Sequence, residues 1–119
     1  MKVAITSTGE GLQSSVDPRF GRAKYFVVVD LETHAATAVS NAVNLNAAQG
    51  AGIQAAKAVI DLGAGALITG HVGPKAFAAL KAGGIAIYPV AGGTVGEAWE
   101  QFKAGALRAM AAADVEGHW

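Results

Sequence analysis

The sequence contains no cysteine among its 119 residues, and this absence removes whole classes of site. Disulfides, thiolate zinc sites and cysteine-ligated iron–sulfur clusters all require cysteine side chains from the chain. Any metal must therefore be held by histidine, carboxylate or backbone groups, or must arrive with its own ligands.

An excess of one charge is also missing, because nine Lys and Arg residues balance nine Asp and Glu residues. Nucleic-acid-binding domains usually carry a basic excess, so we expect no nucleic-acid partner. No apolar stretch is long enough to span a membrane, and the first residues lack the apolar segment of a secretory signal. We therefore expect a cytoplasmic protein without a membrane partner.

Hydrophobic residues are plentiful, at 52% of the chain against 15% charged, and this composition argues against disorder. The length fits one compact domain, which we assign to residues 1–119 with a polar tail from about residue 106. The 16 glycines are clustered, which predicts tight turns or backbone amides that come close to a ligand.

Apolar and β-branched runs predict strands at residues 2–6, 25–30, 35–40, 66–69 and 85–88. Apolar residues at helical spacing predict helices at 51–62 and 74–82, and the capping-box spacing of Thr94 and Glu97 starts a third helix. This order predicts an α/β fold with a mixed five-stranded sheet, strand order 3-2-1-4-5, strand 2 antiparallel and helices on both faces. The order resembles the ribonuclease H-like arrangement.

We expect no enzymatic activity. A nuclease of the ribonuclease H type needs acidic residues on the central strands to hold Mg²⁺, and the strand at residues 2–6 carries none. The sequence also lacks the residues of a serine hydrolase: it has three histidines that could act as a base, but no G-x-S-x-G motif to supply the nucleophilic serine.

The predicted topology gathers the loops at residues 7–22, 41–52, 69–75 and 88–94 at the carboxyl edge of the sheet, where ligands usually bind. Three helix N-termini, which favour anions, are expected there.

The loops at this edge contain three types of candidate cationic or metal-binding side chain, from Arg, His and Lys. Arg19 and Arg22 are either planar donors for an anionic ligand or loop arginines, one of them paired with Asp17. His71 is a candidate metal ligand or an ordinary surface histidine. Lys75, in a first helical turn, is unfavourable against the helix dipole unless an anion lies nearby.

The glycine motif at Gly50–Ala55 matches G-x-G-x-x-A, which is a weak signal for a dinucleotide site. Such a site needs a strand directly before the motif and an acidic residue at the end of the next strand. A polar loop precedes this motif, and the next predicted strand ends at Thr69. Tight helix-to-sheet packing, or amides that face an anion, are the other interpretations. Phe20, between the two arginines, is either a core residue or an exposed lid.

Four segments together resemble the dinitrogenase iron–molybdenum cofactor biosynthesis family. They are Ser15–Ala23, Ala48–Ala56, Ile68–Phe77 and Gly93–Gly105, and they follow the family's order over nearly the whole chain. The resemblance implies a ribonuclease H-like fold and a non-enzymatic carrier or scaffold for a molybdenum-containing metal–sulfur cluster. Partner ATPases are also implied for an alternative role as a regulatory or interaction module.

Within the family, the lack of cysteine and the ending Asp114–Trp119 are most similar to a branch from sulfate-reducing bacteria that binds a mixed molybdenum–copper sulfide cluster non-covalently. An iron–molybdenum precursor is the cargo of another branch. The resemblance and the expected carboxyl edge give His71 as the candidate metal contact and the following candidate cluster-binding residues: Arg19, Phe20, Gly21, Arg22, Gln49, Gly50, Gly52, Thr69, Gly70, His71, Gly73, Lys75 and Thr94.

Overall fold

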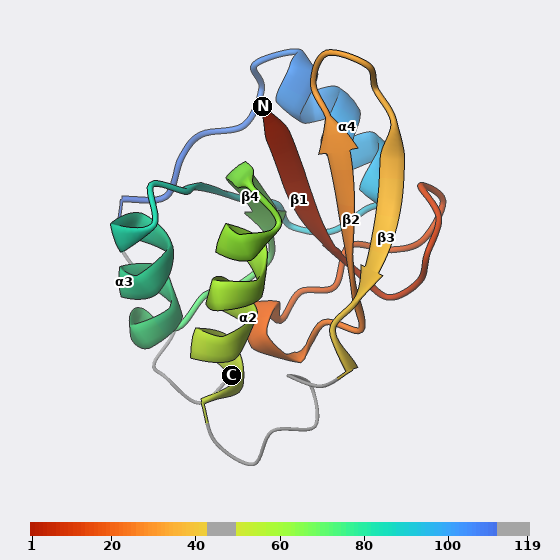
Figure 1. The fold of residues 1–119 in the computed structure, drawn as a ribbon. Coiled ribbons are helices and arrows are strands. Elements are labelled where there is room, and N and C mark those ends of the chain that lie inside the picture. The colour runs from red at the N-terminus through yellow and green to blue at the C-terminus, as the bar shows by residue number, and fades with distance from the viewer. Residues whose placement is uncertain (43–49, 112–119) are drawn as a thin grey trace.

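The computed structural model describes residues 1–42 and 50–111 (Figure 1). The described elements are β1 (Lys2–Ser7), the 3₁₀ turn η1 (Phe20–Arg22), β2 (Tyr25–Asp30), β3 (Ala36–Ser40), α2 (Ala51–Asp61), β4 (Ala64–Thr69), α3 (Pro74–Ala82), β5 (Ala86–Pro89) and α4 (Val95–Lys103).

The five strands form one mixed sheet in the order β3-β2-β1-β4-β5. β2 is antiparallel to both of its neighbours, β1 and β3. β4 is parallel to β1 and to β5. The predicted order and the antiparallel second strand are therefore confirmed, and the arrangement is consistent with a ribonuclease H-like fold.

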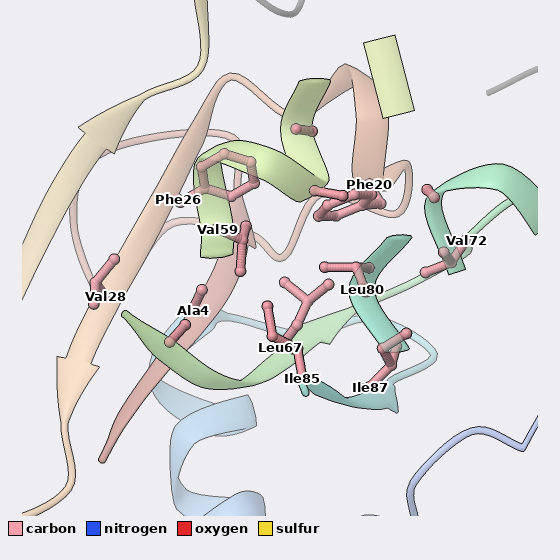
Figure 2. Packing of buried hydrophobic residues seen from close by; sticks show 14 residues of the cluster. Ala4, Phe20, Phe26, Val28, Val59, Leu67, Val72, Leu80, Ile85 and Ile87 are labelled. Carbon is pink, nitrogen blue, oxygen red and sulfur yellow. The ribbon is translucent and has the colours of Figure 1, made fainter. Parts of the chain in front are cut away.

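Helices cover both faces of the sheet, as the sequence predicted. On one face, α2 and α3 lie side by side (Figure 1), and their small apolar residues pack on Phe26, Leu67 and Ile87 of three strands. On the other face, Val95, Ala98 and Trp99 of α4 pack on the opposite side chains of the same sheet. Figure 2 shows the first of these cores, with its side chains converging between sheet and helices.

The helix boundaries follow from local chemistry. Gly63, directly after the C-cap of α2, has a φ of 78°, in the left-handed region that glycine adopts without a steric penalty. Pro74 occupies the first turn of α3, where its missing N–H has no intrahelical partner to lose. The capping box predicted for Thr94 and Glu97 is present at the start of α4.

The segment after α4, which includes the start of the tail predicted from about residue 106, is not helical up to residue 111. Leu107 packs on the α4-side core, and Met110 packs on the core beneath α2 and α3. The Met110 N–H also donates to the Ile87 carbonyl oxygen of β5. Residues 104–111 therefore form a strap that passes from one face of the sheet to the other beside β5. None of the described helices has the length and apolar character needed to cross a bilayer.

Candidate functional site at the carboxyl edge of the sheet

Two loops lie together beyond the carboxyl ends of the parallel strands β1 and β4. An isolated parallel bridge joins Arg19, before η1, to His71, after β4. The His71 N–H donates to the Pro18 carbonyl oxygen at 2.7 Å, and the Phe20 N–H donates to the His71 carbonyl oxygen at 3.2 Å. Two predicted site residues, Arg19 and His71, are thus brought side by side, and both are exposed.

Gly70 makes this close approach of the two loops possible. A Cβ atom added at Gly70 would lie 2.5 Å from the Pro18 carbonyl oxygen and 2.6 Å from the Pro18 Cα. Both are backbone atoms, so no side-chain rotation could relieve the clash. The buried Gly70 therefore has a packing role against Pro18, and its predicted contact with a ligand stays a prediction.

A chain of buried hydroxyl groups supports the same two loops from below. The Thr6 hydroxyl lies 2.8 Å from the Asp17 carbonyl oxygen and 2.8 Å from the Thr69 hydroxyl. A carbonyl can only accept and a hydroxyl has one proton, so Thr6 donates to Asp17 and accepts from Thr69. The predicted site residue Thr69 is fully buried, and its hydroxyl is used in this internal bond.

Asp17 holds the backbone of the arginine loop. Its carboxylate is almost fully buried, and Oδ1 accepts the Arg19 N–H at 3.0 Å. Its own N–H donates to the Thr6 carbonyl oxygen at 2.9 Å. Among the described residues, no ion pair joins the Asp17 carboxylate to the Arg19 guanidinium. Asp17 therefore positions the backbone of Arg19 and leaves its side chain in solvent.

The rest of the η1 segment is more buried than Arg19. The Phe20 side chain is 1% exposed, and its ring centroid lies 6.0 Å from that of Phe26. Figure 2 shows Phe20 within the core between the sheet, α2 and α3, which agrees with the core interpretation of this ring. Gly21 is buried, and Arg22 is half-buried with an interaction of its own.

The N-terminus of α2 lies close to η1 and is not capped by a side chain. Gly50, the N-cap residue, has a φ of 73°, and the first bond inside the helix runs from the Gln54 N–H to the Gly50 carbonyl oxygen. Among the described residues, no acceptor is found for the first amides of the helix, those of residues 51–53. Gly52 lies in this turn. Gln49, also predicted to bind, lies outside the described residues.

The N-terminus of α3 has the same character. Gly73 is its N-cap, no side chain caps it, and the Phe77 N–H closes the first turn onto the Gly73 carbonyl oxygen. Within residues 1–42 and 50–111, no acceptor is found for the N–H groups of Lys75 and Ala76. α2 and α3 pack against each other, and both begin at the carboxyl edge of β1 and β4 (Figure 1).

The N-terminus of α4 differs from the expectation that three helix ends would be open to an anion. The N–H groups of Val95 and Gly96 donate to the carbonyl oxygens of Ser14 and Leu12, at 2.8 and 2.7 Å. The Glu97 N–H donates to the Thr94 hydroxyl at 3.1 Å. The loop after β1 thus covers this end. The Thr94 side chain is a helix cap here, and its predicted ligand contact remains untested.

The cap also shifts a titration. The Thr94 N–H donates to Oε1 of Glu97 at 3.0 Å. This bond, followed by the bond with the Thr94 side chain, lowers the pKa of Glu97 below its ordinary value, because both favour the charged carboxylate. The positive end of the α4 dipole favours a negative charge, and the Glu97 carboxylate supplies that charge from within the chain.

The described residues offer donors at this edge and no metal cage. Within residues 1–42 and 50–111, no three His, Asp or Glu side chains gather closely enough to hold a metal ion. The exposed side chains of Arg19, His71 and Lys75 and the first amides of α2 and α3 are all hydrogen-bond donors in their cationic or N–H forms. This donor set fits an anionic ligand that carries its own metal ligands.

Comparison with known proteins agrees with this picture. The family model described as dinitrogenase iron-molybdenum cofactor matches residues 1–105. The chain belongs to this family. Residues 106–119, which include most of the strap, lie beyond the matched region.

Solved structures of relatives show the same fold as this family member. The apo form of the orange protein from Desulfovibrio gigas is 45% identical, with a TM-score of 0.93 over 96% of each chain. A Thermotoga protein of the DUF35 family is 38% identical, with a TM-score of 0.84 over 98% of each chain. An uncharacterized protein of Methanocaldococcus jannaschii is 28% identical over 90% of this chain and 89% of that protein. The family resemblance found from the sequence is confirmed, and so is the similarity to a protein from a sulfate-reducing bacterium, the orange protein.

Sequence reasoning missed the role of Thr6, which fixes the arginine loop, and the carbonyl groups of Leu12 and Ser14, which close the third helix end. It considered Asp17 as an ion-pair partner of an arginine, whereas the structure shows that Asp17 holds the Arg19 backbone. The Asp-Pro pair was visible in the sequence as a turn signal. Backbone acceptors have no side-chain signature, so no pattern in the sequence could have identified them.

Proposed function

We propose that this protein is a non-enzymatic carrier or scaffold for an anionic, molybdenum-containing metal–sulfur cluster of the molybdenum–copper sulfide type, held non-covalently. The observation that carries the proposal is the pair of uncapped helix N-termini, of α2 and α3, at the same edge as the exposed Arg19. Membership of the cofactor family and similarity to the orange protein support a cluster-binding role.

Each group at the edge has a physical role in this proposal. A sulfide-rich cluster brings its own sulfur ligands, so the cysteine-free chain needs to supply only charge and hydrogen bonds. The first amides of α2 and α3 donate to the anion and place the positive ends of two helix dipoles beside it. The guanidinium of Arg19 is weakly hydrated and planar, which suits a large, soft anion. His71, which lies next to Arg19, is the contact that we propose for the cluster or its metal.

Reconstitution tests the proposal. Apo protein is mixed with tetrathiomolybdate and copper and passed through a gel-filtration column, and molybdenum and copper are measured in the protein peak. We expect both metals to travel with the parent protein. Arg19→Ala should reduce retention several-fold, because hydrogen bonds to charged groups contribute about 1.5–3 kcal/mol each. Arg19→Lys should restore only part of it.

The matched control is Lys2→Ala, which removes a surface cation from the opposite, amino end of β1. It should retain as much metal as the parent. Equal retention by parent, Lys2→Ala and Arg19→Ala would mean that Arg19 has no part in binding. Failure of the parent itself to retain molybdenum would contradict the proposed function.

A second cargo, an iron–molybdenum precursor, is favoured by one observation, the description of the matching family. Elemental analysis of protein purified from its native host distinguishes the two cargoes, because one predicts copper with molybdenum and the other iron. Protein that carries no molybdenum would instead favour the alternative role as a regulatory or interaction module for partner ATPases.

A further inference from the structure

The two edges of the sheet are built differently. β5 is short, ends at Pro89, and has its Ile87 carbonyl oxygen bonded to Met110 of the strap. β3, at the other edge (Figure 1), contains no proline, glycine or charged residue, and its register with β2 runs without a bulge. Within residues 1–42 and 50–111, no segment pairs with its outer side. Bare edges of this kind readily add another strand.

The backbone groups on the outer side of β3 can be identified. The Asn41 N–H donates to the Lys24 carbonyl oxygen, and the Asp30 N–H donates to the Ala35 carbonyl oxygen, each at 2.9 Å. Bonded and non-bonded pairs alternate along an antiparallel ladder. Thr37 and Val39 therefore direct their backbone groups toward β2. The N–H and C=O groups of Ala36, Ala38 and Ser40 face outward.

We propose that β3 pairs antiparallel with β3 of a second copy of this chain, across a two-fold axis at Ala38. In this register Ala38 lies opposite its own counterpart, and Ala36 lies opposite Ser40 of the second copy. All three are outward-facing residues, so each can exchange both backbone hydrogen bonds with its counterpart. The sheet then continues without interruption from one copy into the other.

The side chains agree with a second copy as the occupant. Thr37 lies opposite Val39 of the second copy, which is a β-branched pair that stabilises antiparallel sheets. Both residues line a hollow of about 260 Å³ beside Val28 and Leu62, and the pairing joins the two hollows across the axis. No charged residue lies in the paired segment, whose five residues are ATAVS.

Charge is also complementary in this arrangement. Glu32 lies in the turn at one end of the β2–β3 hairpin, and Lys24 lies just before β2 at the other end. The two-fold axis reverses one hairpin relative to the other, so the acidic turn of each copy lies at the level of Lys24 of the second copy. The formal net charge of zero removes long-range repulsion between copies. The paired area is small, so we expect a weak, concentration-dependent dimer.

Sedimentation velocity with full-length apo protein up to about 1 mM tests the proposal. The parent should shift from the 11.9 kDa monomer toward twice that mass as concentration rises. Ala38→Lys and Ala38→Asp should each weaken the dimer tenfold or more, because like charges directly opposite each other in a sheet are destabilising. An equimolar mixture of the two variants should restore dimer formation, since opposite charges then meet.

Ala38→Pro removes one outward N–H without touching the ladder to β2, and it should also give a monomer. Ala38→Thr keeps that N–H and should dimerise as the parent does. Circular dichroism and thermal unfolding establish that every variant is folded. A parent that stays monomeric at all concentrations, a charge-swap mixture that does not dimerise, or dimers of undiminished affinity in Ala38→Pro would each overturn the proposal. A strand from an unrelated protein that binds β3 while the parent stays monomeric would overturn it as well.

Discussion

Two buried residues, Gly70 and Thr6, determine where the exposed groups of the site lie. Gly70 allows the loop after β4 to touch Pro18, and the Thr6 hydroxyl joins β1 to the carbonyl group of Asp17. Neither residue needs to contact a ligand for its substitution to affect binding. Their effects should therefore appear in stability as well as in retention of the cluster.

We predict that Gly70→Ala destabilises the protein by about 1–3 kcal/mol, the usual cost of forcing extra volume into a packed site. Gly65→Ala, in the strand β4 that precedes Gly70, is the matched control, because the three heavy atoms nearest to the added Cβ belong to the flexible side chain of Met1, at 3.2 Å or more. Gly65→Ala should be neutral or stabilise by up to about 1 kcal/mol through a less flexible unfolded chain. Urea unfolding of the two variants measures the difference, and equal stabilities would refute the proposed role of Gly70.

We predict that Thr6→Val costs about 1–3 kcal/mol, because it leaves two buried polar partners, the Asp17 carbonyl and the Thr69 hydroxyl, without their bond. Thr6→Ser keeps the hydroxyl and isolates the effect of the lost methyl group. The double variant Thr6→Val/Thr69→Val should cost less than the two single variants together, since it removes both members of one bond. Strict additivity in the unfolding free energies would show that the hydroxyl groups act independently.

At the level of elements, the three helices differ in how their first amides are used. α4 is closed by a capping box and by two carbonyl groups of the loop after β1, whereas α2 and α3 begin without side-chain caps. The positive ends of two helix dipoles therefore act on one side of the sheet only. An anion at this edge is drawn toward the α2–α3 face.

The capping box of α4 predicts a pH dependence. Because the folded-state pKa of Glu97 is lowered, its carboxylate stabilises the fold fully above the ordinary glutamate pKa of about 4.3, and this contribution is lost as pH falls through the lower folded value. Glu97→Gln keeps an acceptor for the cap but does not titrate. The free energy of unfolding should therefore fall less steeply on acidification in Glu97→Gln than in the parent.

Glu100→Gln is the control for this experiment, because it removes the same charge within the same helix without touching the cap. Its unfolding free energy, followed by urea titration from pH 7 to about pH 3, should decline as steeply as that of the parent. If the unfolding free energy of Glu97→Gln falls as steeply with decreasing pH as that of the parent, other carboxylates cause the acid sensitivity.

Across the whole molecule, the strap joins the two cores around one edge of the sheet. Leu107 and Met110 pack on opposite faces, and the Met110 N–H bonds to β5. A chain that ends after Gly105 should be about 1–3 kcal/mol less stable than one that ends after Ala111, because it loses the burial of both side chains. Chemical denaturation of these two truncated chains is the measurement, and identical midpoints and slopes would show that the strap contributes nothing.

The sequence was informative where the signal is local. The β-branched run Tyr25–Asp30 identified an interior strand, and Thr94 with Glu97 identified a helix start. These elements, placed with the rules for chain connections, were enough to predict the sheet order. The same topology predicted that the loops containing Arg19 and His71 lie at one edge of the sheet.

What the sequence did not reveal depends on register between distant segments. The Thr6–Thr69 contact exists only because β1 and β4 end side by side, and the closure of α4 uses carbonyl groups that every residue possesses. Phe20 was left open between core and lid because burial of one aromatic side chain in a loop is decided by the helices that later cover it. Such features require coordinates rather than patterns.

The closure of α4 has a consequence for synthesis of the chain. Leu12 and Ser14 leave the ribosome long before Gly96 and Val95, yet their carbonyl groups accept hydrogen bonds from the amides of those two residues. The β1 loop therefore cannot reach its native state until almost the whole domain has been translated. On a ribosome, the loop after β1 is therefore translated well before the helix start that completes its hydrogen bonds.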